Sequence, residues 1–164
     1  MTQTDRADDP ACYDPLMETE GPDIVVVAQG RRLLAVEVKA TGDLARAVDQ
    51  LSRTMLQLPY PVGLVIVAGG LVVLRRDFGT GSIATVGTFS TSGVPALEPP
   101  APGPSAGLVF EARVRQWLES LRSSHVVNAL PRPLFDAVAD WVVPAVAAGE
   151  VRVTGPRPAL ARVG

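Results

Sequence analysis

The sequence predicts an α/β fold with a mixed β-sheet, built in the order strand, strand, helix, strand, strand and followed by C-terminal helices. Four short apolar runs rich in β-branched residues have the composition and length of strands. An amphipathic segment with a helical period separates the second run from the third. The 164 residues, of which 47% are hydrophobic and 20% charged, suit one principal domain with its own core.

The first two runs, residues 24–28 and 33–38, are apolar at nearly every position and predict strands buried on both faces. Gln29, Gly30 and Arg31 lie between the runs and favour a tight turn. The two strands are therefore expected to pair as an antiparallel hairpin.

Residues 44–58 predict an amphipathic helix, because apolar side chains recur at spacings of four and three. These side chains are Leu44, Val48, Leu51, Met55 and Leu58. Pro59 and Pro61 end the helix, since proline lacks the backbone N–H and clashes with the preceding turn. The apolar stripe is expected to cover one face of the sheet.

Two more strands are predicted at residues 62–68 and 71–76. Gly69 and Gly70 join them and favour a two-residue hairpin turn. Residues 79–107 are rich in Gly, Ser and Thr and then in Pro, which predicts a linker or an extended wrap.

The two ends of the chain differ from this core. Residues 1–21 are acidic and without a clear period, which predicts a loose arm before the ordered core at 22–78. Residues 108–164 are expected to form a helical extension with two amphipathic helices, the second disturbed near Pro144, and a short edge strand at 150–154. The two helices either form a small subdomain or pack back on the sheet.

Charge and leader features restrict the class of protein. The net charge is -2, but residues 31–76 hold seven bases and three acids, a net of +4. This excess favours a phosphate backbone near the core, although arginines scattered for solubility explain it equally well. The only cysteine, Cys12, excludes an internal disulfide, and the acidic start lacks the features of a secretion signal. A cytoplasmic protein without a membrane segment is expected, since no apolar stretch approaches about 20 residues.

Three charged residues interrupt the predicted strands. Glu37 and Lys39 are two apart on one strand, so their side chains project from the same face. If Gln29, Gly30 and Arg31 form a three-residue loop, the hairpin register also places Asp23 opposite Glu37. A two-residue loop would shift the register and turn Asp23 away.

Burying these charges is costly unless they are paired or hold a metal ion. An ion pair between Lys39 and an acid at the sheet end would account for them. Alternatively, Asp23 and Glu37 hold a divalent cation, which can neutralise a phosphate and activate water for phosphodiester hydrolysis.

The segment PDIVVVAQGRRLLAVEVKA resembles the core signature of the PD-(D/E)xK, or restriction endonuclease-like, nuclease superfamily. Over residues 20–78 the chain looks like the N-terminal nuclease domain of type I restriction R subunits and RecB-like nucleases. The resemblance implies that Asp23 and Glu37 hold Mg²⁺ or Mn²⁺ together with the Val38 carbonyl. It also implies that Lys39 orients or deprotonates the attacking water, and that Gln50 belongs to the catalytic set.

The chain departs from that pattern at two places. Relatives carry a Glu on a long helix before the first strand, where this chain offers only Glu18 or Glu20. RecB-like members have Gln-xxx-Tyr in the helix, and here Thr54 follows Gln50 at the matching place.

The expected function is a Mg²⁺-dependent nuclease that hydrolyses DNA, with nucleic acid, DNA in particular, as its partner. The resemblance also allows a homodimer. The alternative is a catalytically inactive nuclease fold that binds nucleic acid or a partner protein.

Overall fold

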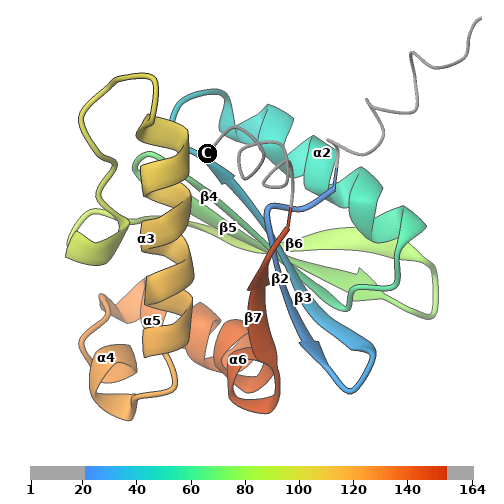
Figure 1. Cartoon of the computed structure of the whole chain (residues 1–164). Helices are drawn as coiled ribbons and strands as arrows, with labels where there is room; N and C mark the ends of the chain where they lie inside the picture. Colours follow the sequence, from blue (N-terminus) through green and yellow to red (C-terminus); the bar gives the residue numbers. More distant parts are fainter. Residues whose placement is uncertain (1–20, 155–164) are drawn as a thin grey trace, which may run out of the picture.

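A six-stranded sheet lies at the centre of the molecule, in the order β6-β5-β4-β3-β2-β7 (Figure 1). The computed structural model describes residues 21–154. The strands are β2 (Ile24–Ala28), β3 (Arg31–Lys39), β4 (Val62–Val67), β5 (Gly70–Asp77), β6 (Ser82–Ser90) and β7 (Glu150–Val153). Only β3 and β4 are parallel, and the crossover between them is helix α2 (Leu44–Gln57). The α/β class with a mixed sheet is confirmed.

The β2–β3 hairpin has the shorter of the two turns considered from the sequence, yet near Ile24 its strands keep the register expected for the longer turn. Ala28 pairs with Arg31, so the loop has two residues, Gln29 and Gly30, both with positive φ as a tight hairpin turn requires. Of the two loop lengths considered from the sequence, the two-residue loop is the one observed. One extra residue, Leu33, bulges from β3. It restores the expected pairing from Val26 back to Ile24, so that Ile24 pairs with Val36.

Helix α2 covers one face of the sheet through a buried stripe that includes Leu51 and Met55. The Asp43 side chain caps its start by accepting the Ala45 N–H at 3.0 Å. At the C-terminal end of α2, the Arg76 side chain of β5 donates to the Met55 and Leu58 carbonyls. These carbonyls have no N–H donor in a following helical turn. The strands and helix predicted between residues 24 and 76 are confirmed. The predicted Gly69–Gly70 turn is wrong by one residue, because Val67 pairs with Gly70 and the turn residues are Ala68 and Gly69.

The C-terminal helices pack on the opposite face of the sheet, which settles the alternative of a separate subdomain (Figure 1). They are α3 (Ala106–Ser120), α4 (Ser124–Asn128), α5 (Arg132–Ala137) and α6 (Val143–Ala148). Buried side chains of α3, Phe110 and Val114 among them, share one apolar cluster with β2, β3 and β4. A five-residue π-helical segment, Val138–Val142, precedes α6. Pro144, the second residue of α6, lacks an N–H and explains the predicted disturbance.

Residues 79–107 are not simply a linker or wrap. Residues 82–90 form β6, an edge strand of the sheet that pairs with β5 along its length. The sequence hid this strand because its large apolar residues, Ile83, Val86 and Phe89, recur at every third position and not at every second one. After β6, a 3₁₀ turn at Pro95–Leu97 and an irregular stretch lead to α3.

The predicted edge strand near the C-terminal end is confirmed as β7, which pairs with β2. Just after it, Thr154 donates its N–H to the Asp23 carbonyl at 2.8 Å and its hydroxyl to the Pro22 carbonyl. The chain entering β2 is thereby fixed from the far end of the sequence. The acidic arm expected at 1–21 lies outside the described residues except for Gly21.

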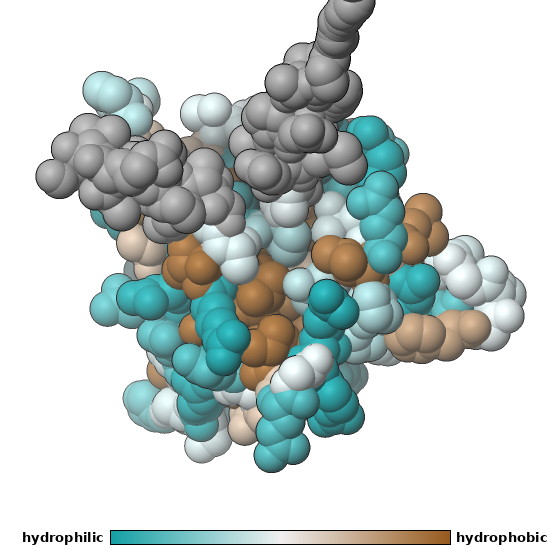
Figure 2. Space-filling view, turned by 45° about the vertical axis from the view of Figure 1, so that its right-hand side comes forward, coloured by the Kyte–Doolittle hydropathy of each residue, from teal (hydrophilic) through white to brown (hydrophobic). Residues whose placement is uncertain are grey.

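The surface mixes hydrophilic and hydrophobic side chains. On the face drawn in Figure 2, hydrophobic residues gather near the centre and hydrophilic ones surround them. Large apolar side chains that are well exposed in the described part of the chain are Leu56, Phe78, Leu108 and Val109. Within residues 21–154, no helix has the length and apolar character needed to cross a membrane.

Gly149, the residue before β7, lies very close to the β2–β3 hairpin. A Cβ at this position would lie 2.7 Å from the Val27 carbonyl oxygen and 2.9 Å from the Leu33 side chain. Gly149→Ala is therefore expected to lower the free energy of unfolding by about 1–3 kcal/mol. Urea titration of the purified protein measures this loss. Gly107→Ala is the control, since no atom lies within 4 Å of the added methyl; an equal loss in both variants would contradict the prediction.

Candidate active site

The candidate site lies in a notch where β3 runs past the start of β2. The last pair between these strands is Ile24 with Val36, so residues 37–39 extend beyond β2 while β4 continues on their other side. Asp23 lies in a bend just before β2, and its N–H donates to the Val36 carbonyl at 2.9 Å. The bulge at Leu33 sets the pairing of Ile24 with Val36, next to Asp23 and Glu37 in the chain.

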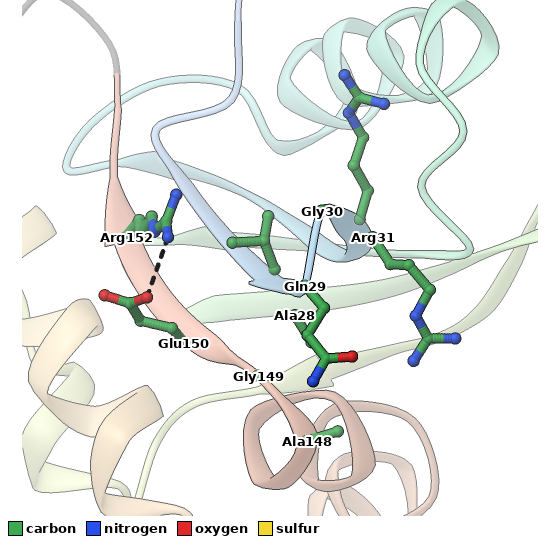
Figure 3. A pocket seen from close by; sticks show the side chains of 10 residues that line it. Ala28, Gln29, Gly30, Arg31, Ala148, Gly149, Glu150 and Arg152 are labelled. Atoms are coloured by element: carbon green, nitrogen blue, oxygen red, sulfur yellow. Dashed lines mark hydrogen bonds and ion pairs between the residues drawn. The ribbon is translucent and has the colours of Figure 1, made fainter.

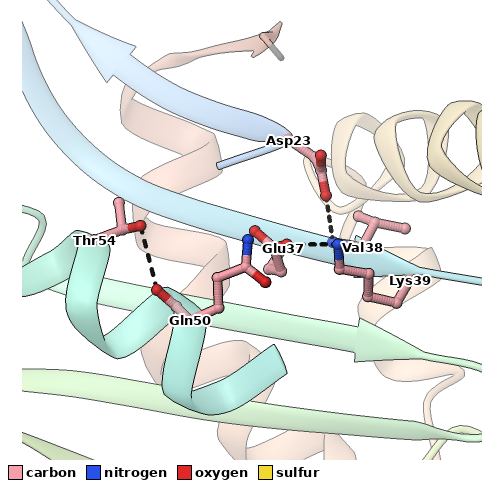
Figure 4. Close-up of polar contacts among 6 residues, drawn as sticks. All are labelled: Asp23, Glu37, Val38, Lys39, Gln50 and Thr54. Atoms are coloured by element: carbon pink, nitrogen blue, oxygen red, sulfur yellow. Dashed lines mark hydrogen bonds and ion pairs between the residues drawn. The ribbon is translucent and has the colours of Figure 1, made fainter. Parts of the chain in front are cut away.

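Asp23 is held at the mouth of this notch. Its Oδ2 accepts the Val38 N–H at 2.8 Å, as Figure 4 shows. In a strand, the N–H and C=O of one residue point to the same side. The Val38 carbonyl therefore also points to the β2 side of β3, where β2 has not yet begun.

Glu37 is the most buried charged residue of the site, with 2% of its surface exposed. Its Oε2 lies 3.2 Å from Lys39 Nζ, and the Lys39 side chain is 42% exposed. Burial, and then the neighbouring charge of Asp23, raise the pKa of Glu37 from its ordinary value of 4.5 to about 7, against the lowering effect of Lys39. A second cation beside Asp23 and Glu37 would favour the ionised form of Glu37 and so offset both the burial and the charge of Asp23.

Gln50 reaches the site from helix α2. Figure 4 shows its side chain extending from the helix toward Glu37. Thr54 lies one turn further on, is buried, and donates its hydroxyl to the Gln50 carbonyl at 3.3 Å. Asp23 just before β2, Glu37 and Lys39 on β3, and Gln50 on α2 thus lie near one another (Figure 4).

Glu111 is an acid of the site that the sequence analysis missed. It lies on α3, is only 8% exposed, and lines a cavity together with Asp23 and Lys39. Its charge makes the smallest of the contributions that raise the pKa of Glu37. A signal was present in the sequence, because Glu111, Val114 and Leu118 follow the helical spacing of one buried stripe.

The cavity beside the site has a volume of about 470 Å³. Asp23, Val38 and Lys39 form one wall, and the stretch from Pro102 to Leu108 forms the other. Within residues 21–154, no group of three or more His, Cys, Asp or Glu side chains is arranged to hold a metal ion. The oxygens available are the Asp23 and Glu37 carboxylates and the Val38 carbonyl, which are hard ligands of the kind Mg²⁺ prefers.

A larger cavity, of about 620 Å³, lies at the other end of the hairpin around Gln29 and Gly30 (Figure 3). Arg31, Arg32 and Arg152 line it, and Arg152 is paired with Glu150 at 3.1 Å. None of the predicted site residues lines this cavity. We therefore place the candidate active site in the notch, despite its smaller volume.

Comparison with protein-family models, with curated proteins and with solved structures gave no match. The candidate site therefore rests on the sequence motif and on the geometry described above.

The raised pKa of Glu37 predicts how stability depends on pH without added metal. The folded protein keeps the proton on Glu37 up to about pH 7, whereas the unfolded chain releases it near pH 4.5. The stability that this proton provides is therefore fully present below pH 4.5 and is lost as the pH rises through 7. The free energy of unfolding should fall by about 3 kcal/mol between pH 4.5 and 8 from this group. Urea titrations in EDTA across this range, with Glu37→Gln as the reference, isolate the effect. Parallel pH profiles for the two proteins would refute it.

Proposed function

We propose that the protein is a metal-dependent nuclease of restriction endonuclease-like fold that hydrolyses DNA phosphodiester bonds. The observation that carries the proposal is the meeting of Asp23, Glu37 and Lys39 at the end of β3. Two carboxylates and an ammonium group in one notch, beside an open cavity, are the groups that this hydrolysis requires.

The donor set fits Mg²⁺ or Mn²⁺. In proteins Mg²⁺ usually keeps several waters and takes only one or two carboxylates, so a site of Asp23, Glu37 and the Val38 carbonyl is sufficient. When bound there, the ion would neutralise charge on the phosphate and lower the pKa of a coordinated water. Burial, and then the charge of Asp23, raise the pKa of Glu37, and a cation beside the two carboxylates would favour their ionised forms against both effects.

The protein side chains have separate roles in this proposal. Asp23 is oriented by the Val38 N–H, which donates to its Oδ2, and the Asp23 carboxylate would be a ligand of the ion. Lys39 is half exposed on the cavity wall, where its ammonium group donates a hydrogen bond to the attacking water. Gln50 approaches Glu37 from α2 and orients that carboxylate (Figure 4).

Glu111 supports the same proposal. The resemblance implies a helical Glu that precedes the first strand in the chain. Here α3, which follows the sheet strands β2 to β6 in sequence, carries Glu111 to the Asp23 cavity. We propose that Glu111 takes the part for which Glu18 and Glu20 were the sequence candidates.

A second candidate function is a nuclease fold that binds DNA without cutting it. The ion pair between Glu37 and Lys39 favours this function, because it satisfies both charges without a metal. Residues 102–108 also line the cavity at Asp23, where they offer a surface for binding.

Metal binding and DNA cleavage, measured together, test the proposal. We expect isothermal titration of Mn²⁺ and Mg²⁺ into the full chain to show binding, and we expect plasmid and single-stranded DNA to be cut in either metal. Asp23→Ala should lose both properties, whereas Asp136→Ala, which removes an exposed acid on α5, should keep both. A wild-type protein that neither binds metal nor cuts DNA would overturn the nuclease proposal and favour the binding module.

A further inference from the structure

The cavity beside the candidate site has two walls of different chemistry. On the side of β3, Asp23 and Lys39 are charged. The other side, formed by residues 102–108 and α3, is apolar at Pro102, Pro104 and Leu108 and also carries Glu111. The apolar side is held in place, because Arg113 of α3 donates to the Glu98 carbonyl at 2.6 Å and anchors the stretch that leads to it.

We propose that this cavity takes a single unpaired strand of DNA, with a phosphate at Asp23 and Lys39 and a nucleobase against Leu108. The inference rests on the proposed function, because Asp23 and Glu37 would repel a phosphate unless a divalent cation lay between these carboxylates and the phosphate. It adds that the substrate is a single-stranded segment or an unpaired end, not the interior of a duplex.

The size of the cavity supports a single strand. Pockets of roughly 300–1,000 Å³ enclose small ligands, and the volume here is about 470 Å³. One nucleotide fits in such a space, whereas a duplex would have to bring both strands between β3 and the wall at Pro102 and Pro104. Enzymes that act within a small pocket on duplex DNA must first take the nucleotide out of the stack.

Leu108 supports the position of the base. It lies in the first turn of α3 and lines the cavity, yet 43% of its surface is exposed. Bases expose flat faces that stack on apolar and aromatic side chains, and this contact does not depend on sequence. Val109, the next residue, is 40% exposed but does not line the cavity, so it provides a matched control.

Fluorescence anisotropy in Ca²⁺, which takes the same oxygen ligands as Mg²⁺, compares a labelled oligothymidine with a duplex closed by hairpins at both ends. We expect the single strand to bind at least about tenfold more tightly than the closed duplex. Leu108→Ser should weaken single-strand binding by about tenfold, while Val109→Ser should stay within about twofold of wild type. Electrophoresis of each sample shows that the DNA stayed intact, and thermal melting shows that both variants are folded.

Equal affinity for the two DNAs, or equal losses in the two variants, would overturn the inference. The outcomes also separate it from the proposed function. If the protein binds single strands through Leu108 but does not cut them in Mn²⁺, hydrolysis fails and the strand site stands. If it cuts the closed duplex as fast as the single strand, the nuclease stands and the strand inference fails.

Discussion

Glu37→Gln is expected to abolish DNA cleavage and, at the same time, to stabilise the protein in the absence of metal above pH 7. The amide keeps the shape of the side chain but removes the charge that would hold the cation. Removal of even a group that supports a metal ligand costs about 10–100-fold in affinity or activity, so loss of the ligand should exceed about 100-fold. The stabilisation follows because the ionised carboxylate is almost fully buried and its pKa is raised to about 7.

Two measurements on the same preparation check this prediction. Initial rates of single-strand cleavage in Mn²⁺ give the loss of activity, and urea titration at pH 8 in EDTA gives the gain in stability, which should be up to about 3 kcal/mol. Glu119→Gln, on the exposed side of α3, is the control for removal of a negative charge. A variant that is inactive but also destabilised would mean that Glu37 serves the fold through its contact with Lys39 and that its role in catalysis is unproven.

The sequence left two loop lengths open, and only the three-residue loop was expected to place Asp23 opposite Glu37. The observed two-residue turn alone would have turned Asp23 to the other face. The extra residue at Leu33 reverses that shift. Periodicity and turn residues locate strands well, but a bulge depends on the partners across the sheet, and the local sequence does not fix these.

Two other features were beyond local patterns for the same reason. Strand β6 has few large apolar residues and forms because the open edge of β5 offers it a complete set of backbone partners. Glu111 joins the site because α3 packs across the sheet near β3, a contact between residues far apart in the chain. In contrast, α2 and the strands around it were predictable, since strong periodicity, proline breaks and glycine turns all agree there.

Phe110→Ala is expected to destabilise the whole molecule and not only its C-terminal helices. The Phe110 side chain is fully buried in the cluster that joins α3 to the inner face of the sheet. Truncation of a buried Phe to Ala leaves a cavity and typically costs about 3–5 kcal/mol. Because the helices and the sheet share this cluster, the loss should lower a single cooperative transition.

The position of the two tryptophans allows this to be measured. Trp117 and Trp141 both lie in the C-terminal helical part, so their fluorescence follows that part, while far-ultraviolet circular dichroism follows the whole chain. The two urea transitions should coincide in wild type and in Phe110→Ala, and both should shift together. Val109→Ala, at an exposed position, should change stability by no more than about 0.5 kcal/mol. If the fluorescence transition occurred at a lower urea concentration than the circular dichroism transition, the C-terminal helices would unfold as an independent unit. Glu111 would then be held near Asp23 only loosely, whereas a shared transition ties the third acid of the site to the stability of the sheet.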